Sequence, residues 1–221
     1  MVEAWEFVTR RPELVAGWAL DHLQITLIAC VIAVILGVSV GVYIAGEGRE
    51  RMADTALYLA EIMMTIPSLA LFGLLMALLS SIGLKSIGFL PAVIALVAYA
   101  QLPILRNTYI AIREVDPAMI EAGKGMGMSE KQLLYKIKLP LAVPVIMAGL
   151  RNAIVMTIAI AAIAALIGSG GLGVPIFRGI RNSRMDLIIV GGVSVAIMGL
   201  LIDFLMSWVE KWVTPKGLKV R

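Results

Sequence analysis

Five long apolar runs dominate this chain and limit what it can fold into. They cover about residues 23–45, 56–80, 89–112, 141–167 and 187–212. A bilayer-crossing helix needs about 20 mostly apolar residues, so each run is long enough to span. Pro67, Pro103 and Pro144 lie within or at the start of runs, which membrane helices tolerate. The pattern predicts an all-α integral membrane protein with about five transmembrane helices in a single domain, residues 1–221.

The composition agrees with a membrane protein. Hydrophobic residues make up 60% of the chain and charged residues 15%, whereas soluble domains have about 45–50% and about 25%. The net charge is +4, but no basic run is long enough to form a nucleic-acid patch. We therefore expect contact with lipid and none with nucleic acid. Cys30 lies in an apolar run and is expected to be a small buried hydrophobe. The N-terminus does not resemble a cleaved signal peptide.

The distribution of lysine and arginine predicts the orientation, because cytoplasmic loops are enriched in both. With segment 113–140 in the cytoplasm, twelve basic residues lie on the inner side and six on the outer side, which places the N-terminus outside and the C-terminus inside. The inner residues are Arg49, Arg51, Arg106, Arg113, Lys124, Lys131, Lys136, Lys138, Lys211, Lys216, Lys219 and Arg221, and the outer ones are Arg10, Arg11, Lys85, Arg178, Arg181 and Arg184.

The polar segment 113–140 separates the third and fourth runs. Asp116 followed by Pro117 is typical of a helix start. Gly127 and its neighbour Gly125 can end that helix, because glycine adopts positive φ without penalty. Ser129 is a second N-cap. The segment therefore predicts two short helices joined by a glycine hinge. By pattern alone, such a pair could lie on the bilayer, pack against this chain's own spans or dock to a partner.

The second helix is expected to end before the fourth span. Leu139 precedes Pro140, and a residue before proline is disfavoured in the helical region. Pro140 can then begin the fourth span. At the first span, Asp21 is a plausible N-cap.

The spacing within this segment resembles the loop of ATP-binding-cassette (ABC) importer permeases. The pattern is Glu-Ala-Ala, three residues, Gly, nine residues, Ile-x-Leu-Pro. The matching residues are Glu121, Ala122, Gly127, Ile137, Leu139 and Pro140. Gly123 replaces the second alanine, which should weaken the helix by about 1 kcal/mol. The resemblance implies that this segment is the coupling helix, which docks into a groove on a cytoplasmic ATPase.

Longer strings resemble one branch of these permeases, which imports glycine betaine, carnitine, choline and proline betaine. They include TIPSLALFGLL (65–75), LPILRNTYIAI (102–112), KLPLAVPVIMAGLRNA (138–153) and IGSGGLG (167–173). The resemblance implies a type I importer permease fold in the inner membrane. It also implies two ATPase subunits that carry ATP and Mg, a second permease subunit (identical or different) and an extracytoplasmic substrate-binding protein.

The string GSGGLG (168–173) also matches the dinucleotide-binding pattern G-x-G-x-x-G. That motif needs a preceding strand and a following helix, whereas here an apolar run precedes it. We expect a tight extracellular turn instead. The family resemblance places Gly170 and Gly171 near the outer end of the translocation path.

Four ionisable residues lie in runs or at their ends: Glu61, Arg106, Arg151 and Asp203. Charges there tend to pair or to face water. We expect Arg151 and Asp203 to pair, within or between subunits; otherwise each would extend to the inner headgroups.

The sequence offers few residues for a substrate path or for catalysis. Pro67, Phe72 and Tyr99 are candidates for the path, the two aromatic residues because they lie well inside the bilayer. His22 is the only histidine, and no Walker A motif is present. We expect no enzyme activity, no metal and no cofactor on this chain. The alternatives are an importer of methionine or another amino acid, and an ion-coupled carrier or channel.

Overall fold

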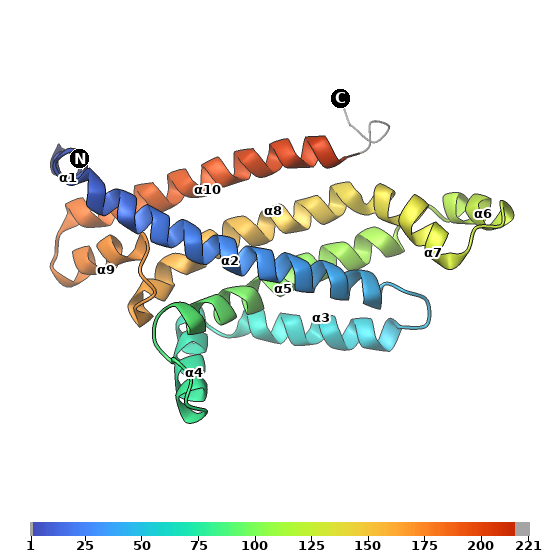
Figure 1. The fold of residues 1–221 in the computed structure, drawn as a ribbon, viewed down its shortest axis with the longest axis horizontal. Helices are drawn as coiled ribbons and strands as arrows, with labels where there is room; N and C mark the ends of the chain where they lie inside the picture. Colours follow the sequence, from blue (N-terminus) through green and yellow to red (C-terminus); the bar gives the residue numbers. More distant parts are fainter. Residues whose placement is uncertain (1, 215–221) are drawn as a thin grey trace.

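The computed structural model describes residues 2–214, and every regular element in that range is helical (Figure 1). The elements are α1 (Val2–Arg10), α2 (Pro12–Ile44), α3 (Glu50–Thr65), α4 (Ser68–Ser81), α5 (Phe89–Arg113), α6 (Pro117–Gly125), α7 (Glu130–Leu133), the π-helical η1 (Leu134–Lys138), α8 (Leu139–Ala164), the 3₁₀ turn η2 (Ala165–Ile167), α9 (Gly173–Arg181) and α10 (Met185–Val213).

The long helices confirm the predicted fold class. Within residues 2–214, four helical stretches are long and apolar enough to cross a membrane: α2, α5, the continuous stretch Glu130–Ile167 and α10. The bent pair α3 and α4 brings the number to five if it counts as one span. These stretches lie lengthwise beside one another, with α6 and α7 projecting at one end and α1 and α9 at the other (Figure 1). The short helices α1 and α9 were not predicted from the sequence.

The predicted span 56–80 is wrong as a single helix. The chain breaks at Ile66 and Pro67, and α4 turns by 102° relative to α3. Pro67 disfavours the helical region for the residue before it, and Ile66 accordingly adopts an extended backbone (φ −69°, ψ 126°). As a result, α4 projects sideways from the bundle (Figure 1).

The first span begins earlier than predicted, so Asp21 does not cap it. α2 starts at Pro12, where a proline in the first turn costs no hydrogen bond and Glu13 suits the positive end of the helix dipole. With 33 residues, α2 is about 50 Å long, more than a bilayer core needs. Its first turns therefore extend beyond the predicted span toward α1.

The predicted break before Pro140 is also wrong. Leu139 stays helical (φ −63°, ψ −48°), and its N–H bonds to the carbonyl of Leu134 in the π-helical turn η1. This wider turn lets one helix continue from Glu130 to Ile167 past Pro140. The second short helix of segment 113–140 is therefore joined rigidly to the fourth span.

α5 occupies the centre of the bundle, between α2 and α8, and glycines bring its neighbours close. On α2, a Cβ at Gly37 would lie 2.6 Å from Ile104 Cγ2, and one at Gly41 would lie 2.7 Å from Thr108 Cβ. On α8, a Cβ at Gly149 would lie 2.8 Å from the carbonyl oxygen of Pro103. Small residues at helix contacts are how membrane helices gain packing energy.

We expect the Gly149→Leu substitution to lower the yield of folded protein severely. A Cβ there would lie 2.4 Å from Asn107 Cβ and 2.8 Å from the carbonyl oxygen of Pro103, and neither atom can rotate away. Overpacking of this kind costs about 1–3 kcal/mol or more. The measurement is the monodisperse fraction and melting temperature in detergent. Gly192→Leu is the control, since a side chain at Gly192 in α10 meets nothing within 4 Å. Equal melting temperatures for the two variants would contradict the proposed packing.

Candidate functional site

Local side-chain chemistry builds the segment between α5 and α8 as predicted. Asp116 accepts a hydrogen bond from the N–H of Ala118 (2.9 Å), which confirms it as the N-cap of α6. α6 ends at Gly125, and Gly127 adopts φ +77° at the hinge. Ser129 and Gln132 then form a reciprocal capping box at the start of α7. The hinge therefore has a defined geometry.

A small apolar core holds α6 against the α7–η1 stretch. Its buried residues are Val115, Leu133 and Ile137. Gly123 is also buried, and a Cβ there would lie 2.5 Å from Leu133 Cδ2 and 2.7 Å from Ile137 Cδ1. Glycine in place of the expected alanine thus lets α6 pack more closely against the α7–η1 stretch. We call this braced unit, residues 116–140, the elbow.

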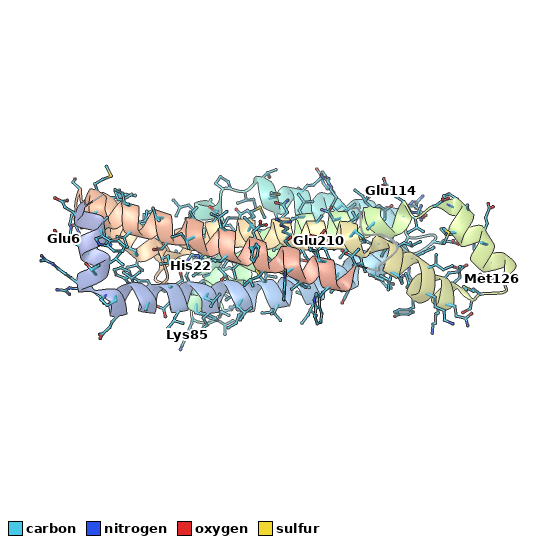
Figure 2. The ribbon with its side chains drawn as sticks, turned by 90° about the horizontal axis from the view of Figure 1, so that it is seen from above. Glu6, His22, Lys85, Glu114, Met126 and Glu210 are labelled. Atoms are coloured by element: carbon cyan, nitrogen blue, oxygen red, sulfur yellow. The ribbon has the colours of Figure 1, made fainter. Side chains whose placement is uncertain are left out.

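The outer surface of the elbow is exposed and carries charged side chains of both signs. Glu121 and Ala122 are exposed, and Glu121 forms no ion pair with another of residues 2–214. Two methionines stand beside them, Met119 at 46% and Met126 at 69% exposure. Met126 lies at the far end of the molecule (Figure 2). Leu139 and Pro140 are half-buried where the elbow joins α8.

Ion pairs connect the elbow to the turn between α2 and α3. Lys124 lies 3.7 Å from Glu47 in that turn and 3.7 Å from Glu130 in α7. In the same turn, Arg49 donates a hydrogen bond to the carbonyl of Tyr43 (2.6 Å) and stacks over its ring. Exposed pairs of this kind contribute little stability individually, so the apolar core is the main brace of the elbow.

The glycine-rich turn lies at the opposite end of the bundle, as the pattern predicted for a tight turn. Gly168, Gly170 and Gly171 all have positive φ, between +80° and +85°. A Cβ at Gly170 would lie 3.1 Å from Asp21 Oδ2, and one at Gly171 would lie 2.9 Å from His22 Nδ1. A helix and a 3₁₀ turn precede the motif, so the strand that nucleotide binding needs is absent from this place.

His22 ties this turn to two helices and was not singled out for that role by the sequence. It is fully buried. Its Nδ1 accepts a hydrogen bond from the N–H of Leu172 (3.3 Å), which leaves Nε2 to donate to the carbonyl of Ile158 (3.0 Å). The imidazole therefore joins α2, α8 and the glycine turn. Only the fold brings these groups together, since Leu172 is 150 residues from His22.

The structure brings Arg151 on α8 and Asp203 on α10 together. The guanidinium donates two hydrogen bonds to the carboxylate, and the Nη2–Oδ2 distance is 2.6 Å. Glu210, two turns further along the same face of α10, lies 3.9 Å from Arg151. These side chains are only about one-third exposed. The pair joins α10, the least buried of the long helices, to the bundle.

The residues predicted to line a path lie close together around the break between α3 and α4. Pro67 is exposed at the break, whereas Phe72 and Tyr99 are buried in the core between α2, α4, α5 and α8. The Tyr99 hydroxyl donates a hydrogen bond to the carbonyl of Ile66 and so stabilises the break. Neither ring is open to solvent in this structure, and the path role of these residues stays a prediction.

A polar face of α3 was missed by the sequence reasoning. Asp54, Tyr58 and Glu61 follow one another at intervals of four and three residues, which places them on one face of the helix. Arg106 of α5 pairs with Glu61. The helical spacing of these three residues could have revealed this face, but the partnership with Arg106 required the fold.

The family comparisons agree with this geometry. Residues 33–216 match the family model described as "binding-protein-dependent transport system inner membrane component". The chain is 41% identical over 204 residues to the osmoprotectant import permease protein OsmW of Salmonella typhimurium, covering 92% of this chain and 94% of that one. It is 40% identical over 199 residues to the glycine betaine/carnitine/choline transport system permease protein OpuCB of Bacillus subtilis, covering 90% and 88%.

A solved structure shares the fold. It is a chain of the MetNI methionine ABC transporter in an inward-facing conformation, with a TM-score of 0.80 at 23% identity, covering 93% of this chain and 99% of that one. At this identity the likeness concerns the fold alone. Together with the family match over most of the chain, it establishes the class of the protein. The chain belongs to the family of binding-protein-dependent transport system inner membrane components.

Proposed function

We propose that this chain is the membrane-spanning permease subunit of an ATP-driven importer of osmoprotectants such as glycine betaine, carnitine, choline or proline betaine. The observation that carries the proposal is the elbow, which presents Glu121 and Ala122 on an exposed surface braced against the fourth span. The identity of about 40% to osmoprotectant permeases over nearly the whole chain supports the substrate class.

The elbow is proposed to couple this chain to a cytoplasmic ATPase. Glu121, Ala122 and the neighbouring methionines would enter a groove on that partner, while Gly127 fixes the angle of α6. Gly123 and Ile137 pack inside the elbow, and Leu139 with Pro140 lies where it joins α8. Because the helix is continuous from Glu130 to Ile167, a displacement of the elbow is transmitted along α8. ATP and Mg would be bound by the ATPase.

The assembly is proposed to contain two ATPase subunits, a second permease subunit and an extracytoplasmic substrate-binding protein. ATP-driven closure of the ATPases would move both elbows and switch the spans from inward-facing to outward-facing. The binding protein would then deliver substrate near the turn that contains Gly170 and Gly171. Arg151 and Asp203 would keep α10 attached to the bundle during this movement.

The proposed orientation places the elbow in the cytoplasm, the N-terminus outside and the C-terminus inside. The end of the bundle that carries the elbow also carries a concentration of basic side chains, as cytoplasmic ends do. They include Arg49, Arg51, Arg113, Lys124, Lys131, Lys136 and Lys138. Lys216, Lys219 and Arg221, which also entered the prediction, lie outside the described residues.

Copurification followed by transport tests this function. A tagged chain is purified from its own cells in mild detergent, and its companions are identified by mass spectrometry. We expect an ATPase subunit among them. Vesicles that contain the reconstituted complex should accumulate glycine betaine, carnitine or choline only when ATP is present on the side of the ATPase. Accumulation driven by an ion gradient without an ATPase would contradict the proposal. ATP-driven uptake of methionine with none of the three osmolytes would replace the substrate class.

A further inference from the structure

An open, solvent-facing cavity of about 540 Å³ lies on the polar face of α3, beside Arg106 of α5. Its lining residues are Asp54, Thr55, Leu57, Tyr58, Glu61 and Arg106. The volume falls within the range of small-molecule sites, roughly 300–1,000 Å³. The lining combines two carboxylates, one guanidinium and one phenol ring. None of these residues belongs to the elbow or to the glycine turn.

The ion pair in this cavity lies deep along the helices. Glu50 and Arg113 pair at 3.3 Å where α3 begins and α5 ends, next to the elbow. Glu61 is eleven residues beyond Glu50, and Arg106 is seven residues before Arg113. At about 1.5 Å of rise per residue, the pair lies some 10–16 Å inward from that end. A hydrocarbon core is about 30 Å thick, so this depth falls within it.

This chain shields the side chains of the pair only in part. The exposed fraction is 46% for Arg106 and 41% for Glu61. Charged side chains at membrane depth are costly against lipid, and they face a water-filled cavity, a charged partner or protein. The pair accounts for only part of the charge in the cavity, because Asp54 adds a second carboxylate on the same face. This face of α3 is therefore unsuited to contact with lipid and suited to contact with water, a charged ligand or protein.

We propose that this cavity is a substrate site within the permease that binds zwitterionic osmolytes carrying a quaternary ammonium and a carboxylate. Arg106 takes the ligand carboxylate in a bidentate contact. The ring of Tyr58, 63% exposed, and the carboxylates of Asp54 and Glu61 surround the ammonium. When the ligand carboxylate replaces Glu61 on Arg106, Glu61 is freed for the ammonium. This inference rests on the proposed osmoprotectant function and goes beyond it by naming the site.

The charges predict how the site discriminates between carnitine and choline. Two carboxylates and one guanidinium leave the cavity with one net negative charge, so a plain cation such as choline keeps its contacts with Tyr58, Asp54 and Glu61. Carnitine also uses Arg106. Removing the guanidinium should therefore weaken carnitine binding much more than choline binding.

The test measures binding of radiolabelled carnitine and choline to the nucleotide-free permease–ATPase complex in lipid nanodiscs, without binding protein. We expect Arg106→Gln to weaken carnitine binding at least tenfold and choline binding less than threefold. Tyr58→Leu should weaken both about fivefold, whereas Tyr58→Phe, which keeps the ring, should weaken neither. Glu50→Gln is the matched control, because it removes the other ion pair between α3 and α5 outside the cavity.

Each outcome bears on the site. Selective loss of carnitine in Arg106→Gln with a silent Glu50→Gln supports it. Equal loss of both ligands in Arg106→Gln, or dissociation of the permease subunits, would show that the pair holds the assembly together and would overturn the site. Absence of binding to the unmodified complex would also overturn it. If that complex still accumulates osmolytes with ATP and binding protein, only the site fails; if it accumulates none, the proposed function fails as well.

Discussion

Replacing Gly127 with valine is expected to lower ATP-driven uptake at least tenfold while leaving membrane insertion intact. Gly127 adopts φ +77°, and a side chain there would meet nothing within 4 Å. The effect therefore arises from the backbone. A left-handed conformation costs an ordinary residue about 1–2 kcal/mol, and β-branching makes it worse. The hinge would relax to another geometry and change the angle of α6 relative to α8. Uptake and ATPase activity of the reconstituted complex are the measurements.

Gly127→Asn is the matched control, because asparagine has a bulky side chain but tolerates the left-handed region. We expect it to retain most of the uptake. Loss of uptake in both variants would assign the effect to bulk at a partner surface rather than to the hinge angle. Full uptake in Gly127→Val would count against a rigid elbow.

Reversing the charge of Arg151 is expected to have the second large effect, a loss of most folded protein. Arg151→Asp would place a carboxylate beside Asp203 and Glu210 at membrane depth, with no cation among the three. Each uncompensated charge inside a bilayer costs about 3 kcal/mol. The measurement is the amount of monodisperse protein extracted from membranes, together with uptake.

The double variant Arg151→Asp with Asp203→Arg restores an opposite pair, and its arginine stays on the same helix face as Glu210. We expect it to recover at least half of the folded protein. Arg10→Asp serves as the comparison, since it breaks an exposed ion pair with Glu6 in α1, where surface pairs contribute about 0–1 kcal/mol. A double variant as poor as the single one would refute the role of the pair.

Local chemistry made much of the fold predictable. Long apolar runs predicted the spans, and the side chains of Asp116 and Ser129 predicted the caps of the elbow, because a cap depends on residues only two or three positions away. The positive φ of Gly127 followed from the same local reasoning. The match of the motif to known permeases supplied the docking hypothesis, which geometry alone leaves open.

The errors came from effects that a local pattern does not determine. A proline in a membrane helix can be tolerated or can end it. Pro67 ends α3, and Tyr99 of another helix hydrogen-bonds at that break, whereas Pro140 is accommodated by a π-helical turn. The sequence does not distinguish Gly149 from other helical glycines, and only the packing of α5 against it shows why a larger residue does not fit. The cavity beside Tyr58 likewise depends on Arg106, which is 45 residues from its partner Glu61.

The most direct test of the central claim is cross-linking at the tip of the elbow. Cys30 is the only cysteine and is buried, so Cys30→Ala with Met126→Cys leaves one exposed thiol. The account predicts a cross-link from position 126 to the copurifying ATPase that changes in yield when ATP is added, and none from Lys85→Cys in the loop between α4 and α5. Labelling of position 126 by a membrane-impermeant maleimide from outside intact cells, with no cross-link to an ATPase, would contradict it.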